Sequence, residues 1–117
     1  MMEHDLEGPI TLVTDMLAAA PIKPGAVTPV SVLKIGPFSV IVFAFDAGVE
    51  LREHHAPVPV LLQVLDGCVQ VEALGQTVDL VPGGLLHLAP EVRHRVVAAE
   101  PSRLQLTILG TGHDPVG

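Results

Sequence analysis

Turn-forming residues recur at short, even intervals along most of the chain, and this spacing constrains the fold more than any other feature. The sequence holds 11 Gly and 11 Pro, and the runs between them are rich in Val, Leu and Ile, the composition of β-strands. Helical periodicity occurs only near the N-terminus. This pattern is typical of an all-β sandwich or barrel and argues against an α/β fold.

The predicted strands run from residue 31 to residue 109. They are 31–35, 38–45, 49–53, 58–65, 68–74, 77–81, 85–88, 94–98 and 103–109. Asp66-Gly67 is the strongest hairpin signal in the chain, because this dipeptide favours the tight turns that join antiparallel strands. We therefore expect the strands on either side of it to form a hairpin.

The chain divides into three parts around this predicted barrel. Residues 1–30 form an N-terminal extension, in which residues 16–20 are expected to form a short helix that Thr14 or Asp15 caps and a proline ends. Residues 21–29 are rich in Pro and are expected to be a loop. Residues 31–109 form the barrel, and residues 110–117 form a loose C-terminal tail.

Charge and composition narrow the class of protein. The formal net charge is −7 without a Lys/Arg cluster, which argues against partners such as nucleic acid or an anionic membrane. Cys68 is the single cysteine, no segment has the apolar length of a membrane span, and the N-terminus is acidic, so we expect a cytoplasmic protein. The positive mean hydropathy of +0.53 favours a homodimer, with residues 38–45 as the candidate interface.

Two histidine-containing segments follow glycines at similar spacings. Five residues separate Gly48 from His54, and Gly67 closes the first segment after a predicted strand. In the second segment, Gly83 precedes Pro90 and His94. Over residues 38–109 the chain resembles the cupin superfamily, whose two motifs are G(x)5HxH(x)3,4E(x)6G and G(x)5PxG(x)2H(x)3N. The resemblance implies a small RmlC-like jelly-roll β-barrel, also called a double-stranded β-helix.

The motifs match this sequence only in part. The positions that fit are Gly48, His54, Gly67, Gly83 and His94. Ala56 and Val60 stand where the resemblance implies a second histidine and a glutamate. In the second motif, the proline, glycine and asparagine positions hold Ala89, Glu91 and Ala98. The registration Pro82-x-Gly84-x-x-His87 is rejected, because its opening glycine is one residue out and it leaves too little chain between the motifs.

Cupin motif residues commonly hold a divalent metal inside the barrel. The resemblance therefore implies a partial metal site at His54 and His94, for one ion such as Zn, Fe, Ni or Mn. The alternative for each histidine is a structural role, with its ring hydrogen-bonded to the backbone. The candidates to replace the missing ligands are His55, Glu50, Glu53 and Gln63. Strand alternation predicts an apolar pocket, lined by Val60, Leu62 and Val96.

The remaining reactive side chains have structural interpretations. His87 is expected to face away from Leu86 and Leu88, and Cys68 to be a buried, inert thiol. Arg93 and Arg95 are expected on a solvated edge, with binding of an anion at the barrel mouth as the alternative.

Three hypotheses for the function follow. The first is a barrel that binds a small molecule, with a partial metal site. The second is a metal-dependent cupin enzyme, such as a dioxygenase, isomerase or decarboxylase, with an atypical ligand set. The third is a domain with a vestigial pocket that acts through its dimer. The sequence identifies no catalytic residue, and whether the protein is an enzyme is left open.

Overall fold

The computed structural model describes residues 9–110, apart from the side chains of Glu53 and His54. This part of the chain contains one short helix and nine strands. The helix is α1 (Met16–Ala19), and the strands are β1 (Val27–Ile35), β2 (Phe38–Phe45), β3 (Glu50–His54), β4 (Val60–Asp66), β5 (Val69–Ala73), β6 (Gln76–Leu80), β7 (Leu86–Leu88), β8 (His94–Ala98) and β9 (Ser102–Leu109). Apart from β1, each predicted strand is confirmed to within two residues at either end.

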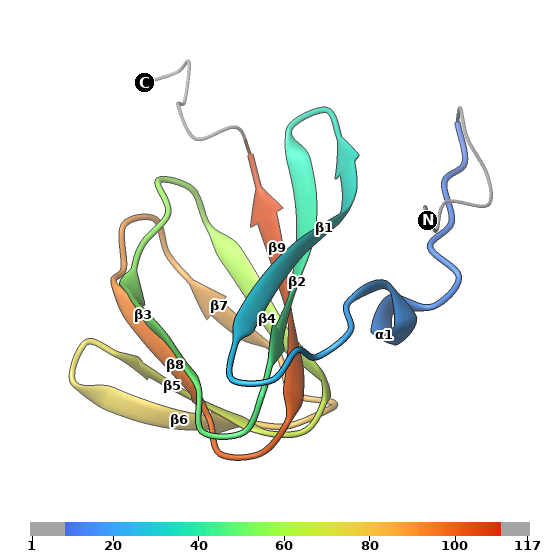
Figure 1. The fold of residues 1–117 in the computed structure, drawn as a ribbon. Coiled ribbons are helices and arrows are strands. Elements are labelled where there is room, and N and C mark those ends of the chain that lie inside the picture. The colour runs from blue at the N-terminus through green and yellow to red at the C-terminus, as the bar shows by residue number, and fades with distance from the viewer. Residues whose placement is uncertain (1–8, 111–117) are drawn as a thin grey trace.

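The strands form two antiparallel sheets that face each other (Figure 1). The large sheet has the order β1-β2-β9-β4-β7, and the small sheet has the order β3-β8-β5-β6. Several connections, such as those from β2 to β3 and from β8 to β9, carry the chain from one sheet to the other. This is the jelly-roll arrangement, so the predicted all-β barrel with a short N-terminal helix is confirmed.

The main core fills the space between the two sheets. Strand alternation directs every second side chain inward, as the burial of His94, Val96 and Ala98 along β8 illustrates. The buried apolar members of this core are Phe45, Val60, Leu62, Val64, Val69, Val71, Leu80, Leu88, Val96, Ala98, Leu104 and Leu106. Aliphatic side chains therefore dominate the core, as the low aromatic content of the sequence requires.

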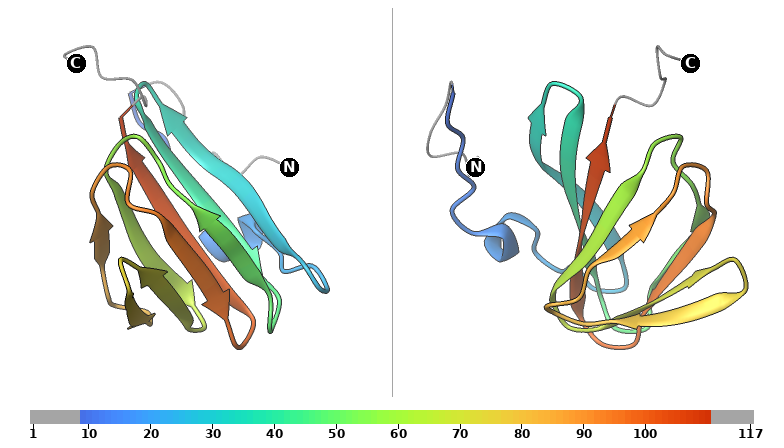
Figure 2. Two further views of the ribbon diagram at one scale, coloured as in Figure 1. Left: turned by 90° about the vertical axis from the view of Figure 1, so that its left-hand side faces the viewer. Right: turned by 180° about the vertical axis from the view of Figure 1, so that it is seen from behind.

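A second, smaller core lies on the outer face of the large sheet. Figure 2 shows α1 on the side of this sheet that faces away from the small sheet. Ala20, just after α1, is completely buried with Val42 and Ala44 of β2. The helix begins where expected, because Asp15 Oδ1 accepts hydrogen bonds from the backbone nitrogens of Leu17 and Ala18 at 3.0 and 3.1 Å.

Arg103 of β9 fastens this N-terminal segment to the sheet. Its Nε donates to the Ala20 carbonyl at 2.7 Å, and its Nη1 donates to Asp66 Oδ2 at 2.9 Å. Only 17% of the Arg103 side chain is exposed. The planar guanidinium suits this position, because it donates along two directions at once.

The predicted loop over residues 21–29 is wrong at its end. β1 begins at Val27, so residues 27–29 are strand. Pro29 is accommodated because β1 lies at an edge of the large sheet and pairs only with β2. An edge strand needs no amide hydrogen on its open side.

The predicted hairpin at Asp66-Gly67 is also wrong. β4 lies in the large sheet and β5 in the small sheet, so the turn carries the chain between sheets. Gly67 has φ of +85°, and a Cβ there would lie 2.5 Å from the Pro101 carbonyl oxygen and would collide with Ser102 Oγ. Close approach to the β8–β9 turn explains this glycine better than hairpin geometry does.

A two-residue hairpin joins β5 to β6 through Leu74 and Gly75. Both residues have positive φ, of 52° and 77°, as a type I′ turn requires. The exposed Leu74 is a poor residue for this backbone conformation. Among the described residues, no helix has the length and hydropathy that a membrane span requires.

Candidate functional site

The barrel has one end at which several loops meet, and we call this end the barrel mouth. It is formed by residues 55–59, residues 89–93 and the turn between β1 and β2 (Figure 1). The Glu91 backbone nitrogen donates to the Ala56 carbonyl at 2.7 Å and ties the first two loops together. Glu91, at the position where the cupin pattern has glycine, has φ of +69°. The backbone thus keeps the conformation that explains a glycine in the motif.

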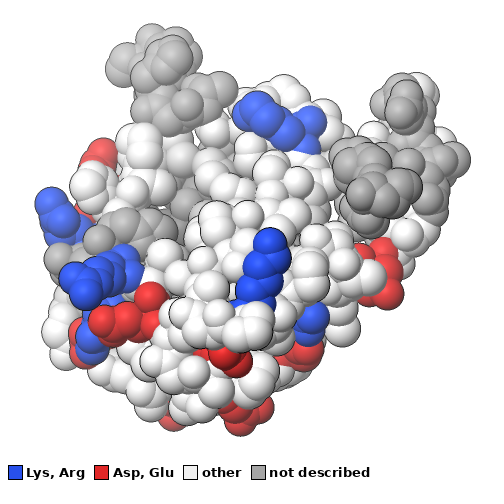
Figure 3. All heavy atoms as spheres, viewed as in Figure 1, with Lys and Arg blue, Asp and Glu red and all other residues white. Residues whose placement is uncertain are grey.

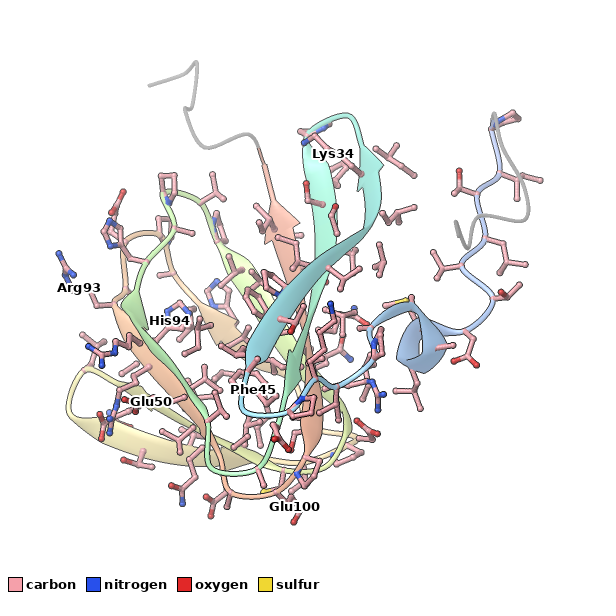
Figure 4. The ribbon with its side chains drawn as sticks, in the orientation of Figure 1. Lys34, Phe45, Glu50, Arg93, His94 and Glu100 are labelled. Atoms are coloured by element: carbon pink, nitrogen blue, oxygen red, sulfur yellow. The ribbon has the colours of Figure 1, made fainter. Side chains whose placement is uncertain are left out.

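His94 is the central polar side chain at this end of the barrel. It is the first residue of β8, and Figure 4 shows it on the barrel side of that strand, whereas Arg93 points away. Only 3% of His94 is exposed. Its Nδ1 lies 3.1 Å from the Val92 carbonyl oxygen, which can only accept, so Nδ1 carries the proton in this bond.

Burial disfavours the charged form of His94. Desolvation lowers its pKa below the ordinary value of 6.5, the bond to Val92 partly opposes this effect, and nearby His55 lowers the pKa further. The ring is therefore neutral at pH 7, with Nδ1 protonated. In that tautomer Nε2 carries the lone pair, which suits it to accept a hydrogen bond or to bind a metal.

His54 lies opposite His94 in the backbone pairing of β3 with β8. Its side chain lies outside the described part of the structure, as does that of Glu53. The two predicted metal ligands thus belong to neighbouring strands of one sheet. That the two histidines bind one metal ion together stays a prediction.

The other expected ligand positions carry apolar side chains in the structure. Val60 lies in the main core, and Ala56 packs against it. Within the described residues, no group of three or more His, Cys, Asp or Glu side chains is placed to hold a metal ion. Apart from the side chains of Glu53 and His54, the donor set at the mouth fits a single imidazole contact better than a tight metal site.

The candidate replacement ligands have other surroundings. His55 is exposed and lies 3.4 Å from Glu91 Oε1. Glu50 Oε1 accepts from Arg95 Nη1 at 2.8 Å. Gln63 is exposed, opposite Gln105 of β9. Neither His55 nor Glu50 belongs to a group of three or more His, Cys, Asp or Glu side chains that could hold a metal ion among the described residues.

The sequence predicts a pocket lined by Val60, Leu62 and Val96. In the structure these residues lie in the main core, and at most 2% of each is exposed. They face the space between the sheets, as alternation predicted. Their contact with a ligand stays a prediction. Exposed His87 lies on β7 between partly buried Leu86 and buried Leu88, so its predicted orientation is confirmed.

Two surface hollows lie near the barrel mouth. One, of about 400 Å³, is lined by Glu72, Ala73, Leu74, Gly75, Arg93 and Arg95. Arg95 Nε donates to Glu72 Oε1 at 3.2 Å, in addition to its bond with Glu50. Figure 3 shows charged side chains of both signs interleaved along this left-hand side of the molecule. The acidic partners offset the arginine charge, which weakens this hollow as an anion site.

The second hollow, of about 360 Å³, is more apolar. It is lined by Lys34, Ser39, Ala56, Pro57, Val58, Ile108 and Gly110. Lys34 and Ser39 come from the β1–β2 hairpin, and Lys34 Nζ donates to Ser39 Oγ at 3.4 Å. The sequence did not single out these two residues, because no motif contains them and their direction depends on a strand irregularity.

Solved structures place this architecture among known folds. No protein-family model matches the sequence, and no curated protein is similar enough to serve as a relative. A conserved protein of unknown function from Streptococcus pyogenes superposes with a TM-score of 0.75 at 17% identity, covering 94% of this chain and 95% of that one. An RmlC-like cupin protein from Desulfovibrio desulfuricans superposes with a TM-score of 0.72 at 23% identity, covering 80% and 92%.

A cupin superfamily protein from Desulfitobacterium hafniense adds a TM-score of 0.71 at 18% identity, covering 76% of this chain and 82% of that chain. Such low identities establish the fold and leave ligand and activity open. The sheet order, the sandwich core and these superpositions agree with the motif resemblance. The chain therefore has the cupin fold, as its sequence predicts.

Proposed function

We propose that this protein binds a small molecule at the barrel mouth, with His94 as the polar group that meets the ligand inside the barrel. The observation that carries the proposal is the burial of this imidazole between two sheets of apolar side chains. A buried polar group in an otherwise aliphatic interior is the arrangement by which many small-molecule sites orient a ligand.

The chemistry of His94 supports this role. The bond from Nδ1 to the Val92 carbonyl holds the ring in one tautomer and one orientation. Burial keeps the ring neutral, so Nε2 is an acceptor toward a hydroxyl or amide donor. A fixed acceptor with apolar neighbours distinguishes ligands by one hydrogen bond and by shape.

A divalent metal such as Zn, Fe, Ni or Mn at the same place is the second candidate. The backbone pairing of His54 with His94 and the bond that His94 makes to Val92 favour it, because metal-binding histidines commonly donate their other ring nitrogen to a carbonyl. Such an ion would supply Lewis-acid chemistry when bound. The described residues around it do not complete a tight ligand set, so we derive no reaction.

Elemental analysis and a ligand screen separate these candidates. The protein, purified without an affinity tag, is compared with His54→Ala and His94→Asn, and exposed His87→Asn serves as the matched control. A fragment library is then tested by thermal shift, because a ligand that binds only the folded state raises Tm.

Ligand-dependent stabilisation that His94→Asn removes and His87→Asn keeps would support the binding proposal. Near-stoichiometric metal that is lost in both His54→Ala and His94→Asn would instead favour the metal-dependent enzyme. Stabilisation that is unaffected by His94→Asn would contradict the role given to His94.

A homodimer and a cytoplasmic location are further proposals. Strand β2 is less available as an interface than its apolar sequence suggested, because it pairs on both sides and buries Val42, Ala44 and Phe45. Its first residue is different: Phe38 lies between Ile35 and Leu109 in register, and all three side chains are exposed. This apolar row, in which Phe38 is the residue from β2, supports a dimer interface.

A further inference from the structure

At one end of the large sheet, a row of side chains on its inner face contains both a charged residue and apolar residues. Lys34, Ser39, Ile108 and Val60 lie opposite one another across β1, β2, β9 and β4. Residues directly opposite in antiparallel strands share a face of the sheet, and Val60 shows that this is the inner face. A lysine on the concave face of a barrel is an informative exception to the usual apolar lining.

A β-bulge directs Lys34 to this face. The register of β1 against β2 shifts between Ser31, which lies opposite Ile41, and Leu33, which lies opposite Val40. Simple alternation from Ser31 would send Leu33 inward and Lys34 outward. The bulge reverses this order and places Lys34 opposite Ser39.

The hollow beside this lysine has one cationic group and mostly apolar walls. Ala56, Pro57, Val58 and Ile108 supply the walls, and no Asp or Glu is among the described residues that line it. Figure 4 shows Lys34 at the free end of the β1–β2 hairpin. Among the described residues Lys34 makes no ion pair, and its only described partner is the Ser39 hydroxyl at 3.4 Å.

We propose that this hollow binds a small monocarboxylate with an apolar body, whose carboxylate meets Lys34 and Ser39 and whose hydrocarbon part lies against Val58 and Ile108. This inference goes beyond the proposed function, because His94 is not among the described residues that line this hollow. One ammonium and one hydroxyl match a singly charged head group, whereas doubly charged phosphates are usually held by several donors. The volume of about 360 Å³ lies at the small end of ligand sites.

The overall charge of the protein favours a ligand that has an apolar body in addition to its carboxylate. At −7, the molecule repels anions at long range, so a carboxylate must gain its binding free energy from local contacts. Both the apolar body and the carboxylate are then required. A short-chain acid such as hexanoate meets both requirements, and hexanamide has the same body without the charge.

The experiment compares these two probes by NMR titration of the labelled full-length chain. We expect hexanoate to shift the amide resonances of residues 34–39 and 56–58 and to bind more tightly than hexanamide. Lys34→Met should weaken hexanoate binding about five- to tenfold, leave hexanamide unchanged and remove the salt dependence of hexanoate binding. Lys34→Arg should keep most of the affinity, and Lys23→Met, which removes an exposed charge from the loop before β1, is the matched control.

Equal binding of both probes, with no effect of Lys34→Met, would overturn the monocarboxylate inference while the proposed binding function stands. Shifts confined to the hollow of Arg93 and Arg95 would overturn it as well, because they would move the anion site. Absence of hexanoate binding up to its solubility limit would also overturn it, and the fragment screen with His94→Asn would then decide the proposed function separately. Lys34 is exposed, so its substitution leaves the core intact.

Discussion

Single residues at the turns and in the barrel interior carry most of the constraints on this fold. His94 combines burial with a fixed tautomer, and Gly67 combines positive φ with a close approach to Ser102. His94 can bind a proton, so its effect on stability depends on pH, whereas the space at position 67 excludes a side chain. Both effects are measurable through stability.

His94 should make folding stability depend on pH. Its pKa is lowered in the folded state by burial, so the unfolded chain binds the proton more readily. The stabilising contribution is complete above the ordinary pKa of 6.5 and is lost as the pH falls from there toward the folded-state pKa. Urea unfolding at a series of pH values should show this loss in the wild type and a weaker loss in His94→Asn.

His87→Asn, at an exposed position, is the matched control for the His-to-Asn substitution itself. An identical slope of stability against pH for wild type and His94→Asn below pH 6.5 would show that the buried ring is not the source.

Gly67→Ala should be one of the more destabilising small substitutions in the chain. The new methyl group would collide with Ser102 and the Pro101 carbonyl, in a backbone conformation that already disfavours a side chain. We expect a loss of about 3 kcal/mol or more in the free energy of unfolding, as strain and overpacking add. Chemical denaturation measures this loss.

Gly75→Ala is the matched comparison. Gly75 has φ of +77°, similar to that of Gly67, but a Cβ there meets no atom within 4 Å. Only backbone strain remains, which amounts to about 1–2 kcal/mol. Similar losses in the two variants would mean that the contact with the β8–β9 turn does not restrict position 67.

At the scale of elements, the N-terminal segment and the large sheet form a unit of their own. The helix α1 is short, and its stability depends on the Asp15 cap and on burial of Ala20 against β2. Arg103 joins this segment to β4 and β9 through two charged hydrogen bonds. We therefore expect the segment to detach first when these bonds are removed.

Arg103→Met should lower the free energy of unfolding by about 1.5–3 kcal/mol, because it removes two hydrogen bonds from a charged and mostly buried group. Limited proteolysis should show faster cleavage within residues 10–26. Arg95→Met is the control, because the Arg95 pairs with Glu50 and Glu72 are partly exposed and contribute at most about 1 kcal/mol. Equal effects of the two substitutions would contradict the fastening role.

At the scale of the whole molecule, the proposed ligand site and the proposed dimer interface lie on different faces of the large sheet. The row of Ile35, Phe38 and Leu109 lies on the outer face of the large sheet, whereas Lys34 lies on its inner face. The same bulge that turns Lys34 inward turns Ile35 outward. Ligand binding and dimer formation are therefore assigned to opposite faces of one hairpin.

Phe38→Ser should shift the protein from dimer to monomer in sedimentation-velocity experiments, because it removes the central side chain of this exposed row. Leu74→Ser is the control, since Leu74 is 79% exposed at the β5–β6 turn. A dimer that persists in Phe38→Ser would place the interface elsewhere. A monomeric wild type would reject the dimer itself.

The sequence alone determined the all-β class, eight strands to within two residues, the short helix and the position of His94 at the start of a strand, and its resemblance to the cupin motifs implied the jelly roll. These features depend on local signals: turn residues, alternation, an N-cap and motif spacing. The start of β1 was missed, because whether Pro29 is tolerated depends on the strand being at an edge of the sheet.

The tertiary structure decided what depends on contacts distant in sequence. Asp66-Gly67, which the sequence predicts as a hairpin, connects the two sheets instead, and Ser102 of β9 lies close to Gly67 there. The tertiary structure also placed Lys34 on the inner face, because a bulge against β2 reverses the alternation that the sequence suggests. Which face a side chain joins is set by strand register, and register is a property of the pair of strands rather than of either strand alone.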